Sequence, residues 1–437
     1  MEIRDDLAST ALLTDQYELT MLAAALADGS AHRRCTFEVF ARRLPNGRRY
    51  GVVAGTGRLL DALPRFRFGE RELEVVAPFL DRRTVDWLRD YRFTGDIDGY
   101  REGELYFPGS PVLSVRGSFA ECVLLETLAL SVLNHDSAIA SAAARMVSVA
   151  AGRRMIEMGS RRTHELAAPS SSRAAYLAGF DATSNLEAVR NFGIPGAGTS
   201  AHAFTLLHSG ADGAHEAEAF RSQVAALGVG TTLLVDTFDI TRGVATAVEV
   251  AGPRLGGVRI DSGDLGVLAR QVRDQLDALG ATSTRIVVSG DLDEYAIAAL
   301  RAEPVDVYGV GTSLVTGSGA PTAGMVYKLV EVDGVPVAKR SSHKESRGGT
   351  KKAVRLARST GTIIEEIIYP AGSPKPDPGG SDVRELQVPL VRAGEVLDNL
   401  PTLTESRDLV ARGLVSLPWE GLKLSAGEPA VPTTFVG

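Results

Sequence analysis

Four stretches in the second half of the chain carry the strongest fold signal: LLVDTFD (233–239), VRIDSGD (258–264), RIVVSGD (285–291) and VDVYGVGTS (305–313). Each contains a short, mostly apolar run and ends in a polar or glycine-rich turn. Successive runs begin 25, 28 and 21 residues apart, at Leu233, Val258, Ile286 and Val307, which is the spacing of strand–helix units. Near-continuous apolar runs are typical of parallel strands covered on both faces. The sequence therefore predicts a parallel α/β sheet or barrel.

Polar residues follow each of the four predicted strands, at the edge where active sites form in parallel sheets and barrels. Carboxylates at this edge can bind ribose hydroxyls or Mg²⁺, and glycine-rich turns expose N–H groups that bind phosphate. A single aspartate after a strand is usually a helix N-cap. Four successive strand ends of this kind predict a site for a phosphorylated, hydroxyl-bearing substrate. The set comprises Asp236 and Asp239, Asp261, Ser262 and Asp264, Gly290 and Asp291, and Gly309, Gly311, Thr312 and Ser313.

Two clusters upstream of these strands add candidate site residues. EMGSRR (157–162) places Arg161 and Arg162 after a glycine, and arginine pairs well with carboxylates and phosphates; the alternative is a solvated helix end. GTSAH (198–202) places His202 just after a glycine-rich turn, where a histidine can act as nucleophile or base. The alternative there is an ordinary core or surface histidine.

The first 118 residues have a mixed pattern. They predict a helix over 14–27, strands over 35–40 and 105–115, and helical structure over 68–92. Residues 119–151 form the most apolar stretch, and Ser118 and Glu121 have capping-box spacing at its start. That stretch predicts a buried helix, or a helix pair interrupted at residues 134–136.

The C-terminal part predicts antiparallel structure. KLVEVDGVPVAKR (328–340) alternates around Asp333-Gly334, which indicates a β-hairpin. We therefore predict an N-terminal mixed α+β domain over 1–118, joined by parts of the C-terminal segment, and an α/β barrel catalytic domain over 119–330. Residues 331–437 are expected to supply the hairpin, a basic loop (341–352) and a tail that packs back on the N-terminal domain.

Bulk composition excludes several classes of protein. A length of 437 residues suits two domains. A net charge of -7, from 47 basic and 54 acidic residues, argues against a nucleic-acid binder. Two cysteines, Cys35 and Cys122, are too few for a disulfide framework or a four-thiolate zinc site. The N-terminus has no signal-peptide pattern and no apolar run has membrane-spanning length, so we expect no membrane association and a cytoplasmic location.

The order of motifs along the chain resembles the nicotinate phosphoribosyltransferases, from near the N-terminus to about residue 340. Eleven motifs in the right order are far more specific than any one of them. They are LLTDQYELTML (12–22), FEVFARRLPNG (37–47), FPGSPVLSVRG (107–117), ETLALSVLN (126–134), EMGSRR (157–162), ATSN (182–185), GTSAH (198–202), DTFD (236–239), VRIDSGD (258–264), VSGDLDE (288–294) and YGVGTS (308–313).

This resemblance implies a fold and a reaction. The fold would be an irregular α/β barrel of the type II phosphoribosyltransferase kind beside a mixed α+β domain. The enzyme would transfer the phosphoribosyl group of phosphoribosyl pyrophosphate to nicotinate, giving nicotinate mononucleotide and pyrophosphate for NAD biosynthesis. Mg²⁺ would be required, and ATP would be hydrolysed in step through a transient phosphohistidine. The family is typically homodimeric, with the active site at the subunit interface.

The resemblance also assigns roles to residues. His202 matches the phosphohistidine, Arg161 an arginine near the nicotinate carboxylate, and Tyr17 a ring-stacking residue that reaches the partner subunit's site. Further matched positions are Asp236 and Asp261 near the ribose and Mg²⁺, Gly290, Gly311 and Thr312 at the phosphate, and Thr199 and Arg259 among the substrate-binding residues.

Substrate choice follows from charge. A relative that takes nicotinamide has an aspartate near the position of Ser184, where it would repel a carboxylate, so Ser184 together with Arg161 favours the acid over the amide. One departure concerns Met158, which stands where many relatives have an aromatic residue. A thioether can still cover a ring face.

Three other interpretations remain. A nicotinamide or quinolinate phosphoribosyltransferase is one, although quinolinate enzymes are shorter and lack the histidine of GTSAH. A catalytically inactive relative that binds the mononucleotide is another, although the candidate residues are all present. An aldolase-like barrel would need a lysine at a strand end, and Lys328 lies past the fourth strand.

Overall fold

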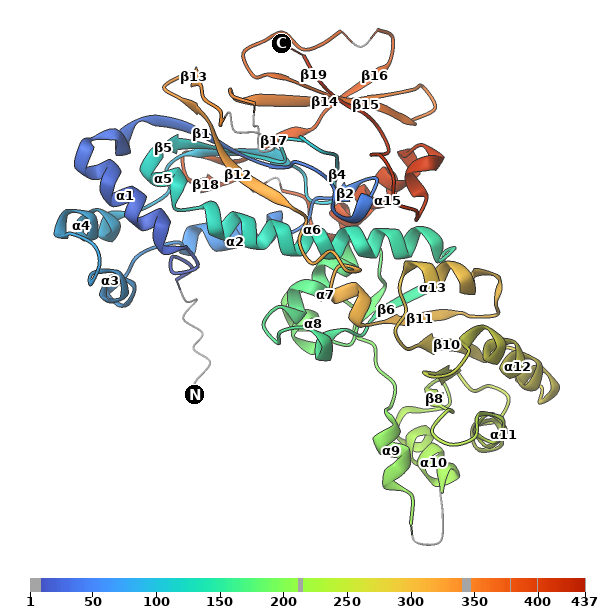
Figure 1. The fold of residues 1–437 in the computed structure, drawn as a ribbon. Coiled ribbons are helices and arrows are strands. Elements are labelled where there is room, and N and C mark those ends of the chain that lie inside the picture. The colour runs from blue at the N-terminus through green and yellow to red at the C-terminus, as the bar shows by residue number, and fades with distance from the viewer. Residues whose placement is uncertain (1–8, 211–214, 340–346, 378, 399, 437) are drawn as a thin grey trace. The chain divides into compact units, whose positions relative to one another are not determined.

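The computed structural model describes residues 9–210, 215–339, 347–377, 379–398 and 400–436 (Figure 1). The chain divides into two compact units: unit 1 comprises Met1–Ser141 and Ala320–Gly437, and unit 2 comprises Ala142–Gly319. We expected the barrel to begin at residue 119 and end at 330. Residues 119–141 instead belong to unit 1, because apolar side chains of this stretch, among them Leu128 and Leu133, lie in the unit 1 core.

Unit 1 is built on a seven-stranded sheet that joins both ends of the chain. Strand β1 (Arg34–Ala41) pairs antiparallel with β5 (Leu113–Ser118) on one side and β12 (Met325–Val332) on the other, as the blue, teal and orange ribbons show (Figure 1). The Phe37 and Tyr327 rings stack across this seam, with 4.9 Å between their centroids. The full order is β13 (Val335–Pro336), β12, β1, β5, β3 (Asp96–Tyr100), β17 (Gln387–Arg392) and β18 (Glu395–Val396).

The predicted hairpin is confirmed, because β12 and β13 flank Asp333 and Gly334, whose φ angles of 48° and 76° are those of a tight hairpin turn. The C-terminal segment holds more regular structure than expected. It forms a second sheet of order β16–β14–β15–β19 and the helix α15 (Leu403–Ser416). The bounds of that sheet are β14 (Lys351–Ala357), β15 (Ile363–Pro370), β16 (Asp382–Glu385) and β19 (Thr433–Phe435). A two-stranded sheet pairs β2 (Gly51–Val52) with β4 (Leu105–Tyr106).

Helix α1 confirms the predicted helix over 14–27, whereas α2 was not predicted. The helical structure predicted over 68–92 is confirmed and takes the form of two helices. The capping box before α5 is also confirmed, with the Ser118 hydroxyl accepting from Glu121 N at 3.3 Å and Glu121 Oε2 accepting from Ser118 N at 3.0 Å. The helices are α1 (Gln16–Asp28), α2 (Thr56–Ala62), α3 (Glu70–Val76), α4 (Arg82–Asp90) and α5 (Phe119–Val123).

Helix α6 (Glu126–Val149) runs through residues 134–136 without a break, so of the two alternatives the single buried helix is right at this point. Its polar residues make tertiary contacts instead: Asn134 exchanges two hydrogen bonds with the Met325 backbone, and Asp136 binds Arg58 at 2.8 Å. Among the described residues, Phe119–Val149 is the one helical stretch long and apolar enough to cross a membrane, and 67% of its most apolar window is buried inside the protein. Core helices pass the same test, and α6 packs as one.

Unit 2 confirms the α/β prediction. Its six strands are all parallel and lie in the order β7–β6–β11–β10–β9–β8, and no described ladder joins β7 to β8, so the irregular barrel stays open there. The strands are β6 (Arg154–Glu157), β7 (Ala182–Thr183), β8 (Thr232–Leu234), β9 (Gly257–Ile260), β10 (Arg285–Ser289) and β11 (Val307–Val310). The helices are α7 (Ala168–Leu177), α8 (Leu186–Phe192), α9 (His202–Leu207), α10 (Glu216–Leu227), α11 (Ile240–Ala251), α12 (Leu265–Ala278), α13 (Glu294–Ala299) and α14 (Thr312–Val315).

The register of this sheet brings the strand ends together. Ser289 at the end of β10 lies beside Gly309, Val310 beside Glu157, and Glu157 beside Thr183. Because the strands are parallel, the turns that follow them share one edge of unit 2. The sequence did not predict β6 and β7, which add the EMGSRR and ATSN motifs to that edge.

Candidate active site

A cavity of about 430 Å³ opens at the C-terminal edge of the unit 2 sheet. It collects side chains and turns from five successive strand ends. Predicted site residues in its lining are Arg161 after β6, Ser184 after β7, Arg259 and Asp261 at β9, Gly290 after β10, and Gly311 and Thr312 after β11. The structure therefore gathers these seven residues around one space, together with Arg162, Asp291 and Gly309, which the sequence also singled out.

Arg259 and Asp261 are joined by a network of short hydrogen bonds that also includes Ser289. Arg259 donates from Nε to Ser289 Oγ at 2.8 Å and from Nη2 to Asp261 Oδ1 at 3.0 Å, and Ser289 Oγ donates to the same carboxylate oxygen at 2.5 Å. Burial raises the pKa of Asp261, but the Ser289 hydroxyl and the Arg259 guanidinium outweigh burial and hold that pKa below its usual value. Asp261 is thus a fixed negative charge at neutral pH.

His202, the first residue of α9, lies beside two carboxylates. Its Nδ1 is 3.1 Å from Thr237 Oγ1, and its Nε2 is 4.0 Å from Asp236 Oδ1 and 3.9 Å from Asp261 Oδ2. The side chain is 41% exposed, so an incoming phosphate can reach the ring. Thr237 was not predicted; its hydroxyl orients the ring and thereby selects which nitrogen faces the carboxylates.

Asp236 has one satisfied and one unsatisfied oxygen. Oδ2 accepts from Asp261 N and Ser262 Oγ, both at 2.8 Å, whereas Oδ1 is buried and has no hydrogen-bond partner among the described residues. A buried carboxylate oxygen without a donor is costly, and a cation would satisfy it.

The oxygen atoms available here fit a Mg²⁺ ion that is bound partly by the protein and partly by a substrate. No group of three or more acidic, histidine or cysteine residues able to hold a metal occurs in the described part of the chain. Mg²⁺ commonly binds through one or two carboxylates and completes its shell with water and substrate phosphates. Asp236 and Asp261 therefore suit a Mg²⁺ ion that arrives with a phosphorylated substrate, not an ion held by protein alone.

Two glycines in the site are required by close packing. Gly290 has φ of 107°, and a Cβ there would lie 2.5 Å from the Asp261 carbonyl oxygen. A Cβ on Gly309 would lie 2.7 Å from Met158 Sδ. The thioether of Met158 can therefore pack against residue 309 in the cavity lining only because that residue has no side chain.

Other predicted residues fall outside the cavity lining. Asp239 and Asp264 are N-caps of α11 and α12, accepting from Arg242 N at 2.8 Å and Val267 N at 3.1 Å. Thr199 Oγ1 accepts from Arg259 Nη1 at 3.4 Å and so supports that arginine. Tyr17 belongs to unit 1, where burial, with Glu126 and Glu18, raises its pKa to about 12.

Sequence reasoning missed two carboxylates near this edge. Burial raises the pKa of Glu216 to about 7; Arg242 opposes the rise and the Asp239 and Asp236 charges add to it, and its Oε1 is buried without a partner among the described residues. Glu157 is buried at the end of β6 and accepts from Ser172 Oγ at 2.8 Å, from Thr183 Oγ1 at 2.5 Å and from Gly159 N. In the sequence, Glu157 is marked only by its place as the first residue of EMGSRR.

Glu157 joins the two strand ends that carry Arg161 and Ser184. Its backbone oxygen also accepts from Ser184 N at 2.9 Å. Replacing it with alanine leaves up to three donors without an acceptor, so we expect Glu157→Ala to lower the free energy of unfolding by about 2 kcal/mol and to raise KM for the ring substrate several-fold. Urea unfolding and steady-state kinetics measure both. The control is the exposed Glu165→Ala, which should change neither; an unchanged KM in Glu157→Ala would contradict the positioning role.

Comparisons with known proteins cover almost the whole chain. Residues 12–134 match the nicotinate phosphoribosyltransferase N-terminal domain model and residues 153–361 match the nicotinate phosphoribosyltransferase family model. The chain is 69% identical over 428 residues to nicotinate phosphoribosyltransferase pncB1 of Mycobacterium tuberculosis, covering 97% of this chain and 95% of that one. It is 38% identical over 370 residues to the nicotinate phosphoribosyltransferase of Bacillus subtilis, covering 81% and 74%. The crystal structure of human nicotinic acid phosphoribosyltransferase aligns with a TM-score of 0.80 and 28% identity, covering 97% of each chain.

Proposed function

The chain belongs to the nicotinate phosphoribosyltransferase family, and on that premise we propose that ATP cleavage on His202 drives its reaction. The protein is a nicotinate phosphoribosyltransferase of NAD biosynthesis, with nicotinate and phosphoribosyl pyrophosphate as substrates. The proposal adds the ATP coupling, the Mg²⁺ requirement, the residues in each role, a homodimeric state and a cytoplasmic location. The observation that supports the coupling is the half-exposed imidazole of His202 between Thr237 and two carboxylates.

The main reaction needs positioning more than proton transfer. The ring nitrogen of nicotinate already holds a lone pair, which forms the bond to the anomeric carbon while the bond from that carbon to the pyrophosphate oxygen breaks and its electron pair leaves with pyrophosphate. Arg161, exposed at the cavity, would bind the nicotinate carboxylate. The backbone around Gly290, Gly311 and Thr312 would bind the phosphate of the sugar.

In the coupled step, a ring nitrogen of His202 attacks the terminal phosphorus of ATP. The nitrogen–phosphorus bond forms as the bond to the bridging oxygen breaks, and ADP leaves with that electron pair. Water later takes the phosphoryl group and restores the imidazole. Asp236 and Asp261, close to Nε2, would stabilise the positive charge that the ring carries while phosphorylated.

Mg²⁺ would be held by Asp236 Oδ1 and Asp261 Oδ2, and it would neutralise charge on the pyrophosphate leaving group. The same two oxygens face His202 Nε2 at about 4 Å. A metal site at these residues would share its carboxylates with the histidine, and this would couple phosphorylation of the ring to the binding of the metal and its phosphate ligands.

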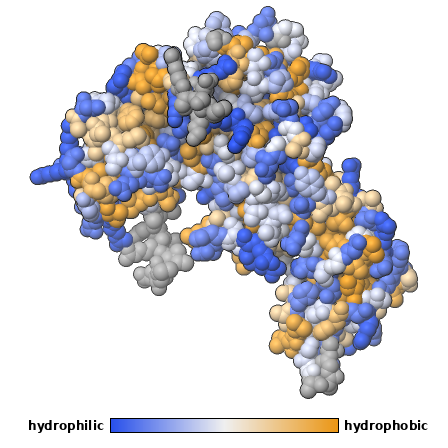
Figure 2. Space-filling model, viewed as in Figure 1, coloured by the Kyte–Doolittle hydropathy of each residue, from blue (hydrophilic) through white to orange (hydrophobic). Residues whose placement is uncertain are grey.

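An exposed apolar stripe supports the homodimer. Leu13, Tyr17 and Met21 are spaced by four residues at the start and along α1, and are 57%, 45% and 37% exposed. Figure 2 shows apolar areas among polar ones on the side of unit 1 that faces the viewer. A second subunit that covers the stripe would take Tyr17 into its own active site, the role that the resemblance implied.

Acid-over-amide specificity gives a separate prediction. Ser184 is exposed at the end of β7 in the same cavity as Arg161, so Ser184→Asp would place a negative charge where the nicotinate carboxylate binds. We expect its KM for nicotinate to rise roughly ten-fold or more, because like charges brought together in a binding site are strongly disfavoured. The control is Ser184→Asn, which has nearly the same size without the charge. Equal KM values in the two variants would remove Ser184 from the specificity argument.

The function as a whole is tested by one assay with several acceptors. Mononucleotide formation is measured from phosphoribosyl pyrophosphate with nicotinate, nicotinamide or quinolinate, each with and without ATP. Turnover of nicotinate that ATP stimulates is the expected result. Turnover of nicotinate that ignores ATP would reject the coupling, and turnover of another acceptor would reject the role of Ser184.

A further inference from the structure

Asn185 is the last residue of the ATSN motif and comes directly after Ser184, which lines the unit 2 cavity. It is the N-cap of α8, where its Oδ1 accepts from Ala188 N at 2.8 Å. The other end of the same amide is also used, because Nδ2 donates to Ser160 Oγ at 3.0 Å. An N-cap needs only the acceptor, which serine or aspartate supplies as well. The donor of Asn185 therefore serves the contact with Ser160, which we call the bridge.

An amide in this position distinguishes α8 from its neighbours. The other three helices of unit 2 that have a described side-chain cap, α11, α12 and α13, are capped by aspartates: Asp239, Asp264 and Asp293. An aspartate at position 185 would also cap the helix, but it would have no N–H to donate and would add a negative charge beside the cavity. A neutral side chain that both accepts and donates suits a turn next to a site for an anionic substrate.

The bridge joins two turns that backbone pairing leaves apart. The β6–β7 ladder ends at Glu157 and Thr183. The chain after β6 then follows β11, since Met158 N donates to Val310 O at 2.8 Å. The 3₁₀ turn Ser160–Arg162 lies past this divergence. Its link to the turn after β7 is therefore made by side chains, through the bridge.

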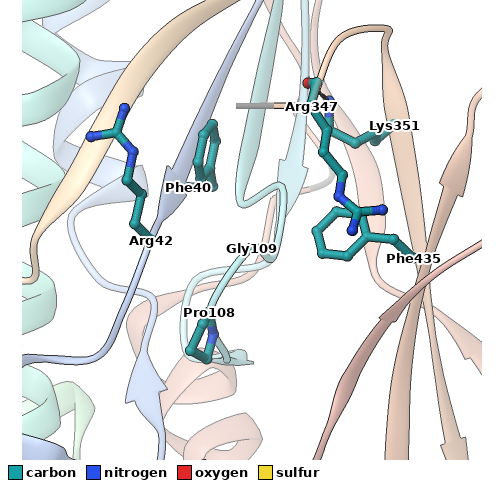
Figure 3. Close-up of a pocket in the computed structure, with 7 residues that line it drawn as sticks. All are labelled: Phe40, Arg42, Pro108, Gly109, Arg347, Lys351 and Phe435. Carbon is teal, nitrogen blue, oxygen red and sulfur yellow. Dashed lines mark hydrogen bonds between the residues drawn. The ribbon is translucent and has the colours of Figure 1, made fainter. Parts of the chain in front are cut away.

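Arg161, the middle residue of that 3₁₀ turn, depends on the turn for its position. Its side chain is exposed and makes no hydrogen bond or ion pair with another described side chain. Other arginines that line cavities are held directly. Arg259 bonds Asp261 at 3.0 Å in unit 2, and in unit 1 the Arg347 guanidinium lies 4.1 Å from the centroid of the Phe435 ring (Figure 3). Whatever fixes the 3₁₀ turn thus also fixes Arg161.

We propose that Asn185 is a positioning residue for nicotinate. Through Ser160 it holds the turn that carries Arg161 at a set distance from Ser184, and this distance defines the subsite for the pyridine carboxylate. The inference rests on the proposed roles of Arg161 and Ser184. Paired hydrogen bonds from a guanidinium to a carboxylate require closely defined geometry, and a misplacement of about 1 Å in a binding group is costly. Asn185 takes no part in the displacement step, so its loss should appear in KM for nicotinate rather than in kcat.

The test removes the bridge from each side. Ser160→Ala deletes the acceptor and leaves the cap of α8 intact, whereas Asn185→Ser keeps a capping oxygen and loses the donor. We expect each variant to raise KM for nicotinate about five-fold or more, the factor that one hydrogen bond is worth, and to leave KM for phosphoribosyl pyrophosphate unchanged. The double variant should be no worse than either single one, because both changes remove the same contact.

Asn191→Ser is the reference substitution, since it makes the same change on an exposed residue of α8, whose amide bonds Glu187 at 3.1 Å. It should leave both KM values unchanged. Additive effects in the double variant, or an equal rise in both KM values, would overturn the proposal, because either result would indicate a general disturbance of α8.

Arg161→Ala separates this inference from the function on which it rests. A raised KM for nicotinate in Arg161→Ala, with unchanged values in Ser160→Ala and Asn185→Ser, would overturn the role of Asn185 and leave the carboxylate subsite in place. An unchanged KM for nicotinate in Arg161→Ala would show that the carboxylate binds elsewhere, and would overturn both.

Discussion

The His202→Ala variant is expected to stop hydrolysing ATP in step with product formation while it still forms nicotinate mononucleotide slowly. The reason is that the imidazole is the nucleophile of the coupled step only; the bond from nicotinate to the sugar needs no group on residue 202. Coupled ATP hydrolysis should fall by at least about a hundred-fold. The measurement is the ratio of ADP released to mononucleotide formed, taken over the same time course.

A matched control for this variant lies directly after the same helix. His208, the residue that follows α9, bonds its own turn through Nδ1 to Phe204 O at 2.9 Å and makes no described contact with the carboxylates of the site. His208→Ala should keep the wild-type ratio of ADP to mononucleotide. A second readout is acid-labile phosphate on the protein after incubation with labelled ATP, present in wild type and absent in His202→Ala. Unchanged coupling in His202→Ala would end the phosphohistidine assignment.

Periodicity was sufficient to find the strands that define the catalytic edge, because β8 to β11 are apolar runs with polar turns behind them. It failed for β6 and β7. The RMIE run of β6 places an arginine and a buried glutamate in four residues, and β7 has only two residues. Their strand character comes from pairing with β11 and with each other, which is tertiary information that local sequence does not contain.

In the candidate site, too, local sequence identifies some features, whereas others depend on tertiary contacts. Four aspartates follow predicted strands in DTFD and DSGD, and local sequence treats them alike. The structure separates them by the direction of each side chain: Asp239 and Asp264 turn back to cap helices, whereas Asp236 and Asp261 face His202. Glu157 is a similar case, because its role depends on Ser172 and Thr183, which are 15 and 26 residues away in the chain.

Asp236, which faces His202, and Asp239, which caps a helix, should respond differently to the loss of their charge. Asp236→Asn keeps an oxygen that can accept from Asp261 N and Ser262 Oγ, so the backbone of the turn should hold. It replaces the unpartnered Oδ1 with a neutral group beside His202, and a cation at that point loses a full negative charge. We expect kcat to fall roughly 10² to 10³-fold, the cost typical of losing one charge-stabilising group at a reacting centre, and the Mg²⁺ concentration needed for half-maximal rate to rise.

Asp239→Asn is the matched control, because it makes the same chemical change three residues away on a side chain that serves as the N-cap of α11 and forms no described ion pair with His202. Asparagine caps helices as well as aspartate does, so this variant should keep both its kcat and its Mg²⁺ dependence. The pair therefore isolates the charge of residue 236 from general disturbance of the turn. A loss of kcat in Asp236→Asn with an unshifted Mg²⁺ dependence would mean that Asp236 acts through His202 alone, and the metal would then have to be assigned to Asp261 and the substrate phosphates. Loss of activity in both variants would place the effect in the structure of the DTFD turn and remove Asp236 from the metal site.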